Sequence, residues 1–392
     1  MDFSGSMIDT IKKYVKHDDS WKYMPISDLG RFIKGSDRAS IFENRKLEPP
    51  ILTSPRISMT NNYFPNPIKE SEFSIYPIDN AEGESELIDR VLNDNSHLDL
   101  DPFLESLDKG CNTGYVLYIH PGSKIKEPIY LDNVLELGSN SLLSRIAIVC
   151  GEGSYADIFE HRVSKNRGYL NQFSNILCDQ AASLNFTLIS ECKNSAIETS
   201  SVVVSKDSSI NLNILLLESQ LSRTCIKVNL IDNNARANLA GLFIASGNDH
   251  IEFHTDMKHN SKNTSSIQNF KGILSDKSSG FFNGLVDISK LGDGSQAIQS
   301  NKNIIFGDNA RMNSNPQLKI NTDDVKCSHG STTGQIDEDV LFYLRSRGIP
   351  LDMAYQMIVA GFSAEVFEQI NNSEIKSYID NAISKSIAKI SW

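Results

Sequence analysis

Several features that define other protein classes are missing from this sequence. Its 392 residues carry a formal net charge of −11, so the basic excess typical of a nucleic-acid-binding protein is absent. No run of about 18 apolar residues occurs, so we expect no membrane-spanning helix. The first residues show no basic segment followed by an apolar run, so we expect no secretory signal. Together these absences predict a cytoplasmic protein that binds neither nucleic acid nor membrane.

Cysteine is scarce and scattered. The six cysteines form no CxxC pair and no compact cluster; they are Cys111, Cys150, Cys178, Cys192, Cys225 and Cys327. In a chain of this length, that spacing is typical of reduced thiols in the cytoplasm rather than of a disulfide framework.

Proline is absent between Pro128 and Pro316. Because proline lacks the amide donor that a strand ladder needs, its absence favours a long series of paired strands. Apolar residues alternate with polar ones in short runs separated by Ser, Asn, Asp and Gly, for example over residues 184–188, 210–216, 224–230 and 251–257. A sandwich, a barrel or a solenoid would fit this pattern, and no exact repeat period selects among them. The length of the region favours a solenoid.

The two ends differ from the middle. Apolar residues recur at helical spacing near residues 7–15, 87–92 and 103–107, around a proline-rich stretch over residues 45–80 that we expect to be extended. At the other end, Asp337 is placed to cap a helix that ends at Gly348. Further helices follow, and the last carries a stripe of isoleucines from Ile375 to Ile390. We therefore predict an N-terminal helical and irregular domain over 1–110, a β core over 111–330 and a C-terminal helical domain over 331–392.

The segment Asp323–Gly330 is the one most suggestive of chemistry. If it is a strand, Cys327 and His329 point to the same face, with Cα atoms about 6.6 Å apart. Thiolate and imidazole are suitable ligands for iron, zinc or copper, yet two ligands make only half of a tetrahedral site. The remaining ligands would come from elsewhere in the chain or from another subunit. The alternative is that Cys327 packs in the core, which is the usual role of a lone cysteine.

Other candidate ligands are weaker. His250 and His254 share strand parity, but His259 has the opposite parity, so structural roles suit the three histidines better than a metal cluster. Asp323 and Asp324 are adjacent and would face opposite sides of a strand, so a turn or solvated role suits them better than an acid pair.

Several segments resemble the SufB/SufD family of iron–sulfur cluster assembly proteins. In the C-terminal part these are Asn315–Ile320, Asp323–Gly330, Gly334–Gln335, Leu341–Ile349 and Met357–Phe362. Further upstream they are Trp21–Tyr23, His254–Thr255, Ser265–Leu274, Asn283–Gly284 and Gln296–Asn301. The specific resemblance spans about residues 250–370. Within it, the sequence Lys-Cys-Ser-His-Gly at 326–330 is similar to the SufD branch of the family, because SufB-like chains carry a glutamate-containing segment there.

The resemblance implies a right-handed parallel β-helix flanked by helical terminal domains. It also implies a non-catalytic scaffold that pairs with a SufB-like paralogue and docks a SufC-like ABC ATPase through its C-terminal helices. A transient iron–sulfur cluster would form at the interface of the two scaffold subunits, with His329 as a ligand and Cys327 as a second candidate, and none is expected in the isolated chain. The missing GxxxxGK[ST] motif agrees, because ATP hydrolysis must then come from a partner.

Two alternatives stay open at the level of sequence. The first is a homodimeric assembly protein of the same family, which would use the same surfaces without a paralogue. The second is a β-helix enzyme acting on polysaccharides, which would need clustered carboxylates on one solenoid face. The presence of only two tryptophans, Trp21 and Trp392, counts against a sugar platform.

Overall fold

The computed structural model describes residues 21–24, 56–78, 91, 103–104, 107, 111, 113–137, 141–164 and 166–390. The helix predicted near residues 7–15 lies outside these residues. Of the two helices predicted over 87–92 and 103–107, the described positions Val91, Phe103, Leu104 and Leu107 are helical.

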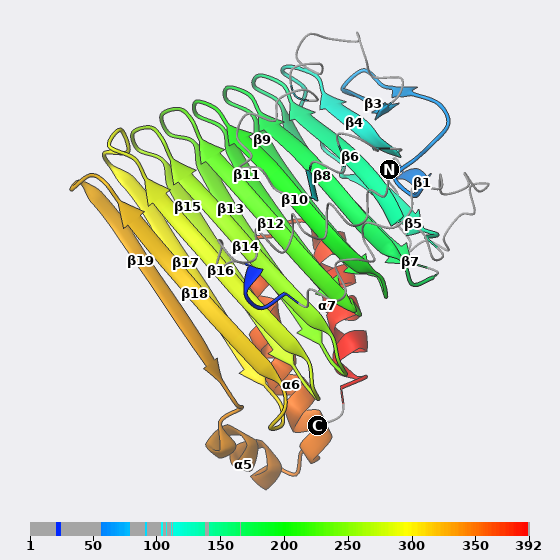
Figure 1. Ribbon diagram of the computed structural model, residues 1–392, viewed down its shortest axis with the longest axis vertical. Coiled ribbons are helices and arrows are strands. Elements are labelled where there is room, and N and C mark those ends of the chain that lie inside the picture. Colours follow the sequence, from blue (N-terminus) through cyan, green and yellow to red (C-terminus); the bar gives the residue numbers. More distant parts are fainter. Residues whose placement is uncertain are drawn as a thin grey trace, which may run out of the picture.

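The described strands form a parallel β-solenoid, which confirms the predicted fold (Figure 1). From β4 onward, successive strands alternate between a nine-stranded sheet, ordered β1-β5-β7-β9-β11-β13-β15-β17-β19, and a ten-stranded sheet, ordered β18-β16-β14-β12-β10-β8-β6-β4-β3-β2. At the edge of the ten-stranded sheet, β3 pairs antiparallel with both β2 and β4. The strands are β1 (Arg56–Thr60), β2 (Ile68–Lys69), β3 (Phe73–Pro77), β4 (Thr113–Ile119), β5 (Ile129–Leu135), β6 (Ser141–Cys150), β7 (Tyr155–Ser164), β8 (Tyr169–Cys178), β9 (Ser183–Glu191), β10 (Ser195–Val204), β11 (Ser209–Leu217), β12 (Leu221–Leu230), β13 (Arg236–Ala245), β14 (His250–His259), β15 (Ser265–Leu274), β16 (Ser279–Ile288), β17 (Ser295–Ile305), β18 (Arg311–Ile320) and β19 (Val325–Gly334).

The sheets extend beyond the predicted borders of the β core at both ends. Strands β1 to β3 precede residue 111 and come from the proline-rich stretch, where only short strands form. At the other end, β19 closes at Gly334 and the first C-terminal helix begins at Glu338. The domain division at 110 and 330 stays a prediction.

The rungs of the solenoid differ in length, which explains why no repeat period is visible in the sequence. Asn211 of β11 bonds to Asn185 of β9, 26 residues earlier, whereas Gln299 of β17 bonds to Gln268 of β15, 31 residues earlier. The turns absorb the difference, and the strands keep their register. Residues at equivalent positions therefore stack in columns along the solenoid axis, inside and outside.

The interior is filled by every second residue of each strand. One such column runs by strand register through Ile129, Ile158, Phe186, Leu212 and Leu239, all packed in or against the main hydrophobic core. Outward-facing positions are polar where solvent reaches them and apolar where another segment covers them. The alternation predicted from sequence thus corresponds to inside and outside of one solenoid.

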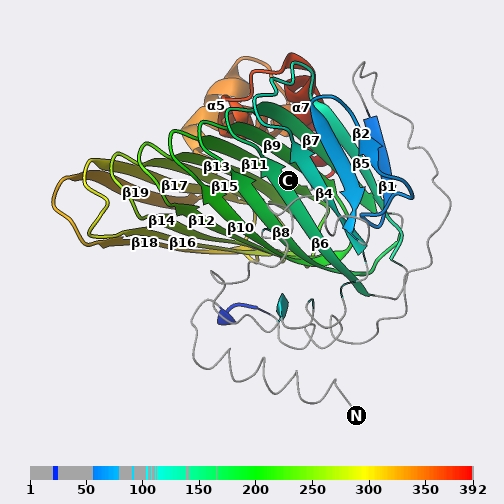
Figure 2. The ribbon, with the colours of Figure 1, turned by 90° about the horizontal axis from the view of Figure 1, so that it is seen from above.

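The Trp21–Tyr23 motif covers part of the ten-stranded sheet from outside (Figure 2). The Trp21 ring stacks on Phe103 with ring centroids 5.6 Å apart and lies under the Arg223 guanidinium, whose carbon is 3.9 Å from the ring centroid. Tyr23 packs on Phe281. These contacts hold the motif against strands β12 and β16.

The C-terminal helices cover the opposite, nine-stranded sheet (Figure 2). They are α5 (Glu338–Ser346), α6 (Leu351–Ala364), the 3-10 turn η3 (Glu365–Phe367) and α7 (Ser373–Ile387). The Asp337 side chain accepts a hydrogen bond from the amide of Asp339, as a helix cap does, and Gly348 has a positive φ of 84° after α5, as predicted. The isoleucine stripe of α7 is buried against the sheet, which identifies it as internal packing.

Lys271 anchors these helices to the solenoid. Its side chain is 1% exposed, and its Nζ donates to the Phe362 carbonyl and to Glu365 Oε2, each at 2.6 Å. The ammonium also lies 4.3 Å from the Phe362 ring centroid, close enough for a cation–π contact. One lysine therefore joins β15 to the end of α6 and to η3.

Replacing this anchor should loosen the helical unit without unfolding the solenoid. We expect Lys271→Met to lower the free energy of local opening of residues 351–390 by about 2 kcal/mol, because a charged hydrogen-bonding group is lost at a buried junction. Hydrogen exchange of α6 and α7 measures this. Lys302→Met is the matched control, since Lys302 is the exposed register partner of Lys271 on β17. Equal exchange in both variants would contradict the anchoring role.

A second prediction concerns acid stability. His259 is fully buried between Thr264 and Ser266, and burial lowers its pKa to about 4. The unfolded chain binds a proton here below about pH 6.5, whereas the folded chain does so only near pH 4. Stability supplied by neutral His259 is therefore complete above about pH 6.5 and falls by about 2 kcal/mol at pH 5.

Urea unfolding of the parent and of His259→Gln at pH 7 and pH 5 tests this. The parent should lose more stability than the variant on acidification. Asp249, whose pKa burial raises to about 6, acts in the opposite direction in both proteins, so the difference between them isolates His259. The same pH dependence in both would show that His259 does not titrate as stated.

Candidate functional site

The solenoid ends at β18 and β19, and both strands present an open edge (Figure 1). Among the described residues, each pairs on one side only, β18 with β16 and β19 with β17. Pro316 lies in β18, where an edge strand tolerates a proline. A side-chain hydrogen bond of 2.8 Å from Ser331 to Ser314 joins the two strands across the last rung.

Cys327 and His329 lie on β19, and their side chains face the solenoid axis. Their register partners on β17 are Ala297 and Gln299, which are buried, whereas the intervening Ile298 is 50% exposed. Because side chains alternate along a strand, Cys327 and His329 continue the inward face. The prediction that both share one face is confirmed. Their exposure arises because no further rung of the described chain covers them.

The two residues differ in their surroundings. Cys327 is half-buried and packs against the edge of the main core. Burial raises the pKa of its thiol, and a backbone hydrogen bond with Ala297 opposes that rise. His329 is exposed and makes no hydrogen bond or ion pair with the part of the chain that the structure describes. Its imidazole is therefore available to a ligand or a partner.

Among the described residues, no three His, Cys, Asp or Glu side chains gather as a metal-binding group. Asp323 and Asp324 are both exposed in the turn before β19. Cys327 and His329 therefore lie on one face, and no third candidate ligand lies with them in the described part of the chain. Their role as half of a metal site stays a prediction.

A polar column lies beneath His329, and the sequence reasoning missed it. In strand register, Gln268 of β15 and Gln299 of β17 precede His329 in the column that is apolar up to Leu239. Both glutamines are buried, at 0% and 1% exposure. Thr255 donates to Gln268 Oε1 at 2.6 Å, and Gln299 Nε2 donates to the same oxygen at 3.4 Å. The change from leucine to glutamine at inward-facing positions was the available signal.

The three histidines on β14 are structural. His250 and His254 each hold one carboxylate oxygen of Glu252 at 2.8 Å, and Arg223 reaches the same carboxylate at 2.5 Å. Burial alone would raise the pKa of Glu252, but the two histidine hydrogen bonds and the charge of Arg223 hold it well below its usual range. His259 points to the interior and takes no part, as its parity predicts.

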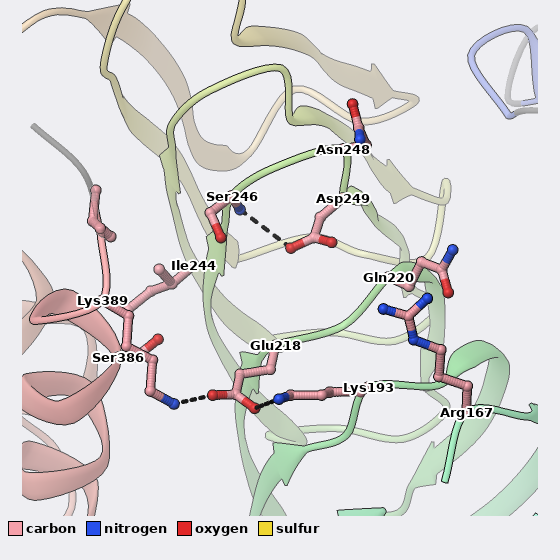
Figure 3. A pocket seen from close by; sticks show the side chains of 11 residues that line it. Arg167, Lys193, Glu218, Gln220, Ile244, Ser246, Asn248, Asp249, Ser386 and Lys389 are labelled. Carbon is pink, nitrogen blue, oxygen red and sulfur yellow. Dashed lines mark hydrogen bonds and ion pairs between the residues drawn. The ribbon is translucent and has the colours of Figure 1, made fainter.

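One cavity of about 430 Å³ lies between the strand ends and α7 (Figure 3). Lys193 and Lys389 share the carboxylate of Glu218, so this one negative charge is paired with two positive ones. Arg167 and Asp249 complete the polar lining. No residue of β18 or β19 lines it, so it is separate from the half-site.

No helix in the described part of the chain has the length and apolar character needed to span a bilayer.

Comparison with known proteins identifies the family. The family described as "SUF system FeS cluster assembly, SufBD core domain" matches residues 134–362. The iron–sulfur cluster assembly protein SufD of Escherichia coli is 25% identical over 374 residues, which cover 93% of this chain and 86% of that protein. SufD of Bacillus subtilis is 23% identical over 282 residues, covering 70% of this chain and 64% of that protein.

A SufBD family protein of Mycobacterium tuberculosis is 29% identical over 247 residues, covering 60% of this chain and 58% of that protein. The matched segment contains most of the solenoid, the open-ended last rung and most of α6. The chain therefore belongs to the SufB/SufD family of iron–sulfur cluster assembly proteins, on its SufD side.

Proposed function

We propose that this chain is a non-catalytic scaffold subunit that pairs with a SufB-like paralogue, docks a SufC-like ABC ATPase and contributes His329 to a nascent cluster. The observation that carries the proposal is the open last rung, where an unpartnered imidazole stands beside two unpaired strand edges. The polysaccharide-active alternative receives no support from the family assignment.

The two edge strands support pairing with a second scaffold chain. An open strand is a template for another strand, and soluble proteins usually shorten or cover such edges. Here β18 and β19 are each ten residues long. A solenoid with the same kind of open end would pair its own last strands with them and bury both interiors.

Such pairing would complete the half-site. An iron–sulfur cluster accepts thiolate and imidazole ligands, and the cluster is the cargo of the assembly reaction rather than a resident group. His329 would supply one ligand, and the partner would supply others across the interface. Cys327 is a second candidate, although its packing against the core explains its position without a metal.

The C-terminal helices carry an exposed apolar patch suited to a partner. Exposed apolar side chains on α5 and α6 include Phe342 at 74%, Tyr343 at 56%, Met353 at 53% and Met357 at 52%. Met353 and Met357 are four residues apart and share one helix face. The two helices are in contact, and several large exposed apolar side chains on neighbouring elements are typical of protein interaction sites, which supports ATPase docking here.

Loss of His329 should remove the cluster and leave the complex assembled. We expect His329→Ala to lower iron and sulfide content of the co-expressed three-component complex, purified without oxygen, by about tenfold, because a ligand is lost from an exposed site with few alternatives. Subunit stoichiometry should not change. Ser328→Ala is the matched control, since Ser328 is its exposed, outward-facing neighbour.

Cys327→Ala in the same assay separates its two roles. A packing role predicts a lower unfolding temperature with normal cluster content. A ligand role predicts a normal unfolding temperature with lower cluster content. Unchanged cluster content in His329→Ala would show that this histidine is not a ligand, and the chain would then serve mainly to hold its partners.

Disrupting the apolar patch should release the ATPase alone. We expect Phe342→Ser with Met357→Ser to weaken ATPase binding by at least tenfold, because exposed apolar anchors supply much of such an interface. The scaffold pair should still form. Leu291→Ser is the control, since Leu291 is 67% exposed on a turn far along the chain from these helices. Co-purification of the ATPase with the double variant at normal stoichiometry would place the docking surface elsewhere.

The homodimeric alternative rests on the same open edges. Native mass measurement of this chain, alone and co-expressed with a SufB-like paralogue, distinguishes the two. The proposal expects the paralogue to displace any self-association, whereas a homodimer that persists in its presence would favour the alternative.

A further inference from the structure

The last three rungs carry a continuous polar column that ends at His329. Its members, Gln268, Gln299 and His329, occupy the positions that Ile158, Phe186, Leu212 and Leu239 occupy in earlier rungs. The polarity therefore extends two rungs below the open end. Solvent does not account for it, because both glutamines are buried.

Two atoms of this column lack partners. Within the described residues, Gln299 Oε1 and Gln268 Nε2 are buried with no hydrogen-bond partner. A buried amide oxygen without a donor is costly, and leucine would avoid that cost by continuing the column. The orphaned acceptor of Gln299 lies one rung from the unpartnered imidazole of His329.

The facing strands leave room for this amide. Thr255, Gly284 and Pro316 form the corresponding column of the ten-stranded sheet. A Cβ at Gly284 would collide with the Gln299 side chain, so the glycine creates the space that the amide fills. Pro316 has no polar side-chain atom and offers His329 no competing partner.

We propose that Gln299 is a positioning residue for His329: the structure shows both groups without a partner in the described part of the chain, and a rotation of these neighbouring side chains lets the Gln299 amide oxygen accept a hydrogen bond from one imidazole N–H. Register neighbours on adjacent strands are about 4.8 Å apart, which a glutamine side chain spans. Donation from one ring nitrogen fixes the tautomer and directs the other nitrogen's lone pair out of the open end. Gln268 supports Gln299 from below. The importance of this arrangement for a cluster rests on the proposed function.

The test is the tautomer of His329 in the isolated full-length chain. Long-range proton–nitrogen NMR of protein labelled with 15N-histidine resolves the ring nitrogens of the eight histidines, and His329→Asn assigns the resonance. In mildly alkaline buffer we expect one tautomer in the parent, seen as a wide separation of the two ring-nitrogen shifts. Gln299→Leu should narrow the separation toward that of a free imidazole.

Matched variants exclude a general structural effect. Gln299→Glu keeps an acceptor at the same place and should retain the single tautomer. Gln296→Leu makes the same change at an exposed outward position of β17 and should change nothing. Thermal unfolding of Gln299→Leu should show that the solenoid end stays folded, so that a changed tautomer reports the loss of the hydrogen bond to His329.

The second measurement uses the co-expressed complex. Iron should be removed by a chelator about tenfold faster from the Gln299→Leu complex than from the parent or the Gln299→Glu complex. A mixed tautomer in the parent, or an unchanged tautomer in Gln299→Leu, would overturn the proposal. If His329→Ala leaves cluster content intact, the ligand role fails, whereas the tautomer result still decides whether Gln299 orients His329.

Discussion

In-register pairing of parallel strands is the constraint on which the rest of the structure depends. Because each residue stacks on the equivalent residue of the next rung, a side chain in the interior contacts its neighbours in the same column and those of the facing sheet. Turns can lengthen without disturbing the columns, as the spacing of 26 to 31 residues shows. The same rule requires that a solenoid ends with unpaired edges and an uncovered interior, unless something caps it.

The outer faces of the solenoid and its last rung differ in how far other segments cover them. Buried anchors close the outer faces: Trp21 lies against Arg223 on one sheet, and Lys271 holds the C-terminal helices on the other. The rung formed by β18 and β19 has no such cover in the described part of the chain, and its side chains are mostly exposed. The open end is therefore where the fold offers both backbone edges and inward-facing side chains to another molecule.

Local signals predicted paired strands with helical ends, the family resemblance added the parallel β-helix, and the site could be predicted only in part. Missing proline and strict alternation indicated stacked strands, and Asp337 and Gly348 marked a helix correctly. Parity placed Cys327 with His329 and separated His259 from His250. Whether that face of β19 points into the solenoid or out of it depends on which residues of β17 are buried, and only the tertiary structure shows this. The stacking of Gln268, Gln299 and His329 was hidden because the rung length varies.

The polar column costs stability next to the residue to which we assign a function. Each buried amide atom left without a partner costs about 1–3 kcal/mol, a noticeable part of the 5–15 kcal/mol that typically holds a domain together. Five earlier rungs show that apolar residues fill this position well, from Ile129 to Leu239. The change to glutamine coincides with the approach to His329. Within this column the two glutamines stand only on the rungs next to His329, and the proposed role of that imidazole at the solenoid end accounts for this placement.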